Sequence, residues 1–159
     1  MKTNRIVWAV LGVVLLAAAG VTVFLAVPRS AAGAKSNDWV GSWNVQVTVV
    51  NANATFPGLL TFFSDGNVSA DETPVPFETS GHGSWVKTGV NGAAYTFNYL
   101  IGSEAPDQWI VGTVTGEVEY DPKTDQWSGP FTIKLVDQAG AEVFADTGRM
   151  SGTRIAVPH

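Results

Sequence analysis

The sequence predicts an all-β fold, an antiparallel up-and-down barrel of about eight strands preceded by an apolar N-terminal segment. Three observations lead to this fold class. From Trp39 onward, apolar residues alternate with polar ones, as in strands with one buried face. Short clusters of turn residues interrupt the alternation, and no helical pattern lies between them. Charged residues make up only 14% of the chain while glycines are abundant, which is typical of a turn-rich β protein.

The N-terminal residues 1–27 form the apolar segment. Lys2 and Arg5 precede an uncharged run over residues 6–27, which as a helix would extend about 33 Å and span a bilayer core. We therefore expect a signal anchor or a signal peptide, with membrane contact through residues 6–27. Ala32-Gly33-Ala34 resembles a signal peptidase site. The following domain is accordingly expected on the extracytoplasmic side of the cell membrane, or secreted if the chain is cleaved near Ala34.

Residues 28–38 are rich in Ala, Ser and Gly and are predicted to be a linker. The barrel domain is predicted over residues 39–157. Strand-like alternation bounded by turn residues recurs nine times in this stretch. The predicted strands are 41–50, 58–63, 67–71, 83–87, 93–101, 108–120, 126–136, 141–145 and 149–157.

The alternation is clearest in the strand predicted at 108–120. Its even-numbered residues from 110 to 120 are apolar or glycine, whereas Glu117 and Glu119 belong to the other face. Gly112 and Gly116 on the buried face would let the strand bend or let a large neighbouring side chain fit. Consecutive hairpins of this kind are best closed into a barrel, because closure removes exposed strand edges. A two-sheet β-sandwich is the alternative.

Composition excludes several function classes. The net charge of −5 comes from scattered acidic residues, and nine Lys and Arg are too few for a basic stripe, so no nucleic acid partner is expected. Without cysteine there is no disulfide or thiolate site. No metal site is predicted, because His82 is the only histidine of the domain besides the terminal His159. No cofactor motif and no catalytic motif is present, and the sequence does not indicate an oligomeric state.

Two short motifs carry a family resemblance. Gly41-Ser42-Trp43-Asn44 begins the first predicted strand, and Gly152-Thr153-Arg154-Ile155 lies in the last. Together they resemble the signature of the calycin superfamily, which includes lipocalins, fatty-acid-binding proteins and avidins. The resemblance implies a structural role for Gly41, Trp43 and Arg154, in which the arginine covers the tryptophan at the closed end of the barrel. Such stacking contributes about 0.5–2 kcal/mol.

A second segment also carries a resemblance. Gly81-His82-Gly83-Ser84-Trp85 is similar to segments of exported bacterial barrels. The size of the domain is also similar to that of allene oxide cyclase barrels, which implies an enzyme as an alternative.

Inward-facing aromatic residues are the candidate ligand contacts. A barrel of eight strands is just wide enough for a small ligand, but the same rings could simply fill the core. His82, flanked by glycines, is a further candidate, with a plain turn residue as the alternative. The predicted ligand-binding residues are Tyr95, Phe97, Tyr99, Trp127, Phe131 and His82.

Other polar residues are better explained by structure. Glu117 and Glu119 could form a pair of catalytic carboxylates, but a solvated strand face explains them. Asp121, Thr124 and Asp125 lack the spacing of a calcium loop and are expected to cap a turn.

Three function classes follow from these observations. The first is an exported or membrane-anchored lipocalin-like barrel that binds a small apolar molecule or lipid. The second is a small barrel cyclase or isomerase that encloses its substrate in a shaped apolar cavity. The third is a filled barrel with a structural or protein-interaction role.

Overall fold

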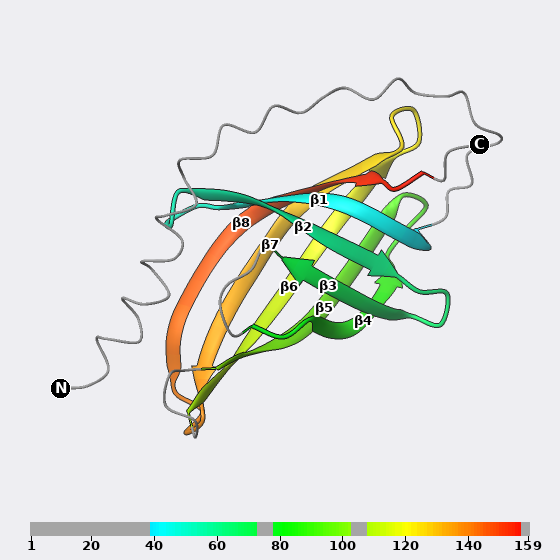
Figure 1. Cartoon of the computed structure of the whole chain (residues 1–159). Helices are drawn as coiled ribbons and strands as arrows, with labels where there is room; N and C mark the ends of the chain where they lie inside the picture. The colour runs from blue at the N-terminus through cyan, green and yellow to red at the C-terminus, as the bar shows by residue number, and fades with distance from the viewer. Residues whose placement is uncertain (1–38, 73–77, 103–107, 157–159) are drawn as a thin grey trace.

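The structure, a computed structural model, describes residues 39–72, 78–102 and 108–156 (Figure 1). The predictions for the anchor, the cleavage site and most of the linker concern residues 1–38 and lie outside the described residues. Within the described residues, no helix is long and apolar enough to cross a membrane.

Eight antiparallel strands form a closed barrel. Each strand pairs with the next along the chain, and β8 pairs with β1 to close the sheet. The predicted barrel is therefore confirmed, and the sandwich alternative is wrong. The strands are β1 (Gly41–Val49), β2 (Ala54–Phe62), β3 (Asn67–Glu72), β4 (Gly81–Lys87), β5 (Gly92–Gly102), β6 (Trp109–Asp121), β7 (Gln126–Asp137) and β8 (Glu142–Arg154).

The predicted division of the last strand into 141–145 and 149–157 is wrong. Residues 146–148 are fully part of β8, because they pair with β7 and because Gly148 also pairs with Val49 of β1. The side chain of the polar Asp146 is buried in the barrel. Alternation along β8 therefore continues through a charged residue.

Strand β2 begins earlier than predicted and includes Pro57. Residues 54–57 pair with β1, whereas pairing with β3 begins only at Gly58. A proline is tolerated here because this part of the strand has a neighbour on one side only.

The barrel has two distinct ends. The capped end carries Trp39, the start of β1, the end of β8 and the turns 63–66, 88–91 and 122–125. The distal end carries the turns 50–53 and 138–141 and the connections from β3 to β4 and from β5 to β6. In Figure 1 the capped end lies to the right and the distal end to the left, with the turn between β1 and β2 at the upper left and the turn between β7 and β8 at the lower left.

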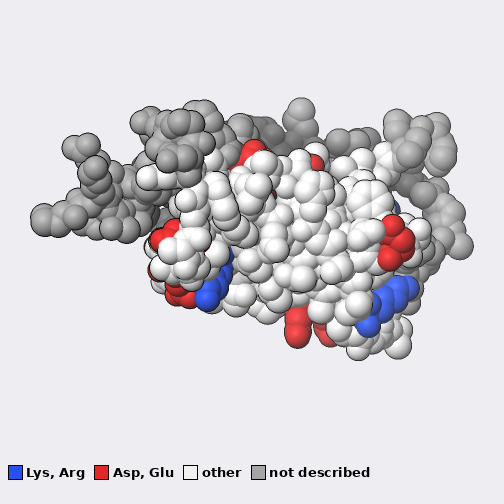
Figure 2. Space-filling view, turned by 90° about the horizontal axis from the view of Figure 1, so that it is seen from below, with Lys and Arg blue, Asp and Glu red and all other residues white. Residues whose placement is uncertain are grey.

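Side chains alternate between the barrel interior and solvent. The buried hydrophobic residues form one cluster that includes inward residues of all eight strands. Charged side chains face outward or lie near the ends. In the face drawn in Figure 2, they lie around the margin of a broad uncharged area, and the Lys and Arg atoms form separate patches with no stripe.

Aromatic side chains lie across glycines on neighbouring strands. A β-carbon on Gly116 would lie 2.5 Å from the ring carbon Cζ of Tyr95, and one on Gly148 would lie 2.5 Å from the ring of Phe131. Each glycine is the register partner of the aromatic residue that covers it. Glycine on the buried face therefore makes room for a ring on the neighbouring strand, which is one of the two roles predicted for Gly112 and Gly116.

Candidate functional site

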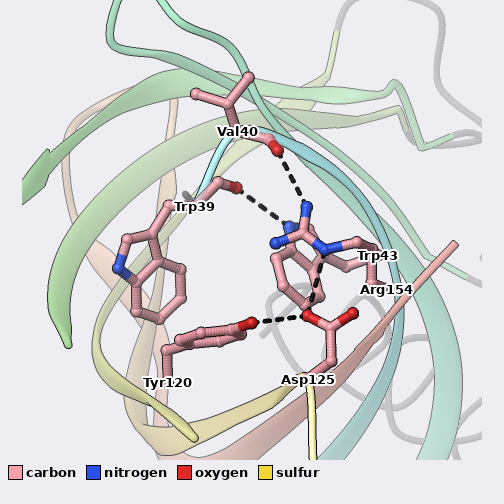
Figure 3. A network of polar contacts seen from close by, with 6 residues as sticks. All are labelled: Trp39, Val40, Trp43, Tyr120, Asp125 and Arg154. Atoms are coloured by element: carbon pink, nitrogen blue, oxygen red, sulfur yellow. Dashed lines mark hydrogen bonds and ion pairs between the residues drawn. The ribbon is translucent and has the colours of Figure 1, made fainter. Parts of the chain in front are cut away.

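A polar network closes the capped end (Figure 3). The guanidinium carbon of Arg154 lies 4.1 Å from the centroid of the Trp43 ring. Its Nε donates to Asp125 at 3.2 Å, and its Nη1 donates to the carbonyl of Val40 at 3.0 Å. The Tyr120 hydroxyl also donates to Asp125, at 2.7 Å. Asp125 thus ties the last strand to the turn between β6 and β7.

The geometry explains the residue types of the first motif. Gly41 has a φ of 135°, a region that residues with a side chain rarely adopt. A β-carbon there would also lie 2.8 Å from Nη1 of Arg154. Trp43 is fully buried, and its indole N–H donates to the carbonyl of Trp39 at 3.2 Å. Gly41, Trp43 and Arg154 therefore form a structural closure and leave no room for a ligand.

Aromatic rings fill the capped half of the interior. Trp39, Trp43, Phe62 and Trp127 are at most 2% exposed, and the centroids of their contacting rings lie 5.7–6.4 Å apart. These separations are typical of direct aromatic contact. The capped half is therefore core.

A contact across the interior lies at the border between this aromatic core and the distal half. The Tyr95 hydroxyl of β5 lies 3.0 Å from the sulfur of Met150 of β8. The ring of Phe97 stacks on that of Tyr95, with centroids 6.0 Å apart and an angle of 11° between the planes. These three side chains form a floor that separates the capped half from the distal half.

The inner side chains of the distal half are less completely buried. Val49, Tyr99, Ile101 and Ile110 are 6–8% exposed, whereas inward residues of the capped half such as Trp43 and Phe62 are 0% exposed. Further inward residues of the distal half are exposed to an intermediate degree, namely Phe56, Ile133 and Phe144. Trp85 near the capped end is also 8% exposed, so the difference between the two halves lies mainly in Phe56, Ile133 and Phe144, the inward side chains of intermediate exposure.

A small cavity lies beside this floor. It has a volume of about 10 Å³ and is lined by Val45, Val47, Leu60, Ala70, Glu72, Phe97 and Met150, together with residues 58, 59 and 71. That volume is close to the minimum that one water molecule requires. The lining is mainly apolar, and Glu72 brings a carboxyl group to it.

Two carboxyl groups lie at the distal end in apolar surroundings. Glu72 follows Val68 and Ala70 on the inner face of β3, and Glu78 pairs with the inward Ile101. Burial raises the pKa of Glu72 to about 7. Burial, and then the charge of Glu72, raise the pKa of Glu78 to about 8. Both groups are therefore partly protonated near neutral pH.

Tyr99 is the aromatic residue of the predicted set that lies beside these carboxyls. Tyr99 is 6% exposed, and burial, followed by the charges of Glu78 and Glu72, raises the pKa of its hydroxyl. Within the described part of the chain, the carboxyl groups of Glu72 and Glu78 and the hydroxyl of Tyr99 form no hydrogen bond or ion pair, although the backbones of both glutamates pair with neighbouring segments. The distal end thus holds three polar groups without partners among these residues.

Asp146, a third carboxylate of the distal end, is fully engaged. It accepts hydrogen bonds from the Asn51 side chain at 2.8 Å, from the Thr147 amide at 2.7 Å, and from the Asn51 and Ala52 amides at 3.3 Å. Its four donors come from the turn between β1 and β2 and from its own strand. Asp146 therefore fixes a turn at the distal rim.

The predicted ligand contacts do not share one site. Trp127 belongs to the aromatic core of the capped half, and Tyr95 and Phe97 form the floor. Phe131 lies across Gly148 and is 2% exposed. Of this set, Tyr99 reaches the distal half.

His82 lies on the outside of the barrel. It is exposed on β4 and pairs with Ser69 and Asn98, while its neighbour Gly81 faces inward. It therefore does not contact the interior with the aromatic residues. Glu117 and Glu119 are exposed on β6, as a solvated strand face requires.

The turn 121–125 is capped by its first aspartate. Asp121 accepts hydrogen bonds from the Lys123 amide at 2.9 Å and the Thr124 hydroxyl at 3.0 Å. Asp125, which has a φ of 54°, also binds Arg154.

Sequence reasoning missed Glu72 and Glu78 as site residues. The predicted third strand ended at residue 71, although continuing the alternation from Val68 and Ala70 by one step would have placed Glu72 inside. Glu78 follows an irregular connection, and its position depends on an isolated bridge to Ile101 that no local pattern indicates.

Comparison with known proteins does not assign the chain to a family, because no family model and no curated protein matches it.

Proposed function

We propose that the protein is a calycin-like barrel that binds a small apolar molecule through its distal end. The observation that carries this proposal is the exposure of apolar side chains inside the distal half: the inward Phe56, Ile133 and Phe144 are exposed to an intermediate degree, whereas the rings at the centre of the capped half are at most 2% exposed. A ligand that covers them would gain about 25 cal/mol for each Å² of apolar surface removed from water.

Binding requires the cavity to enlarge, because about 10 Å³ does not hold an organic molecule. Met150 is the side chain best suited to move. Its thioether chain is unbranched and flexible, and its main polar contact is the weak interaction with the Tyr95 hydroxyl. Displacing it would join the cavity to the solvent-exposed surfaces of Phe56 and Ile133. The capped half, held by ring contacts and by Arg154, would not change.

Binding of N-phenyl-1-naphthylamine, a neutral apolar fluorophore, to the full chain tests the proposal. We expect saturable binding that Ile133→Trp abolishes, because the larger inward side chain fills the distal interior. Leu100→Trp is the matched control. Leu100 is 47% exposed on the outer face of β5, so a larger side chain there does not enter the interior. Equal binding by the two variants, with both folded by circular dichroism, would refute the proposal.

A further inference from the structure

We infer that the ligand of the distal end carries a protonated nitrogen, held by the carboxyl groups of Glu72 and Glu78. This inference rests on the proposed function and names the chemical class of the ligand: an apolar body with an ammonium group. The reasons are the position of the two carboxyls, the absence of a cation near them among the described residues, and the apolar walls around them.

The two glutamates share one region of the interior. Glu72 lines the cavity. Glu78 pairs with Ile101 of β5, and the Ser80 hydroxyl, two residues further on, donates to Asp71, the neighbour of Glu72. The ring of Tyr99 lies on the wall formed with Gly112. Polar groups from β3, from β5 and from residue 78 therefore converge at the distal end.

No protein cation neutralises these carboxyls within residues 39–72, 78–102 and 108–156. Arg154 belongs to the capped end. The other basic residues of these ranges, Lys87, Lys123, Lys134 and Arg149, are exposed. Asp146 is the third inward carboxylate, and its four hydrogen bonds come from N–H groups. The field inside the distal half is therefore negative once the two glutamates lose their protons.

A negative, apolar interior selects among ligands of similar size. Carboxylates such as fatty acids would bring a like charge into a region of low dielectric, which is unfavourable. Neutral molecules would leave the glutamates without a partner. An ammonium group would donate hydrogen bonds to both carboxylates, and its positive charge would compensate their negative charge. An amphiphilic amine is therefore the class that the residues fit best.

Competition among three ligands of equal length tests this inference. Octylamine, octanol and octanoate would each displace N-phenyl-1-naphthylamine from the full chain. We expect octylamine to bind at least about tenfold more tightly than octanol, and octanoate to bind most weakly. In the Glu72→Gln, Glu78→Gln double variant the preference for octylamine over octanol should disappear while octanol binding is retained. The double variant Glu117→Gln, Glu119→Gln removes the same charge from the outer face and should keep the preference.

The pH dependence gives a second readout. Octylamine stays protonated, like the lysine side chain with its pKa of about 10.4. The glutamates lose their protons as pH rises through about 7 and about 8, so octylamine binding should tighten over this range and octanol binding should not.

The outcomes separate the two proposals. Equal binding of octanol and octylamine, or a preference unchanged in the Glu72→Gln, Glu78→Gln variant, overturns the ammonium inference and leaves apolar binding intact. Failure of all three ligands and of the fluorophore to bind overturns both.

Discussion

The ring of Tyr99 on β5 lies directly over Gly112 on β6, its register partner. The same arrangement relates Tyr95 to Gly116 and Phe131 to Gly148. In each pair the glycine lacks the β-carbon that would collide with the ring. The barrel wall is therefore built from pairs in which a large side chain on one strand requires the smallest residue on the next.

Replacing Gly112 with alanine should destabilise the barrel. The added β-carbon would overlap the Tyr99 ring and force it from its position, so we expect the free energy of unfolding to fall by about 1–3 kcal/mol. Urea unfolding of the full chain measures the change. Gly89→Ala is the matched control, because a β-carbon on Gly89 has no atom within 4 Å, and it should stay within about 0.5 kcal/mol of the parent. Equal effects of the two substitutions would contradict this account of the wall.

The barrel could be predicted from sequence because its signal is local and repeated. Alternation along residues 110–120 and turn residues at 63–66 and 122–125 each indicate a strand or a hairpin without knowledge of the rest. The structural role of Gly41, Trp43 and Arg154 could be predicted because these residues belong to motifs that resemble the calycin signature. The closed sheet then follows from the number of hairpins and the cost of free edges.

The distal carboxyls could not be predicted in the same way. Glu72 lies at the last position of its strand, where boundaries from sequence are uncertain by a few residues. Asp146 resembles a turn residue in the sequence, and its inward position depends on hydrogen bonds to residues 51 and 52, more than 90 positions away in the chain. Contacts of this kind are set by the register of β8 against β1.

Replacing Arg154 with methionine should weaken the capped end. The variant keeps much of the apolar stem but loses the stack on Trp43 and the hydrogen bonds to Asp125 and Val40. We expect a loss of about 1–3 kcal/mol in the free energy of unfolding. Lys134→Met is the control, since its ion pair with Glu142 is more than half exposed on both sides and contributes little. If both variants unfold at the same urea concentration, the cap does not stabilise the barrel.

Asp146→Ala should loosen the turn between β1 and β2. Removing the carboxylate takes the acceptor away from the amides of residues 51, 52 and 147, whose hydrogen bonds are part-buried, at a cost of about 1–3 kcal/mol. Hydrogen exchange of these amides should accelerate more than that of β6 amides such as Val114. Asp137→Ala, which removes a similar cap from the exposed turn at 138–141, is the comparison. Unchanged protection at residues 51 and 52 would show that Asp146 does not fix this turn.

Stability should decrease as pH rises toward 8, because two carboxyl groups have raised pKa values in the folded state. Burial raises the pKa of Glu72 from 4.5 to about 7, and that of Glu78 from 4.5 to about 8. Between pH 4.5 and these raised values, the folded chain binds more protons at the two carboxyls than the unfolded chain does. The stability that the two groups contribute is therefore fully present below pH 4.5 and is lost as pH rises through about 7 and about 8. The free energy of unfolding, measured in urea at fixed salt from pH 5 upward, should therefore fall over this window.

Glu72→Gln should reduce this decrease for two reasons. It removes one titrating group, and it also removes the charge that raises the pKa of Glu78. Glu119→Gln on the exposed face of β6 should leave the slope unchanged. A slope that is the same in Glu72→Gln and Glu119→Gln would mean that the partly buried carboxyls of Glu72 and Glu78 do not titrate with raised pKa values.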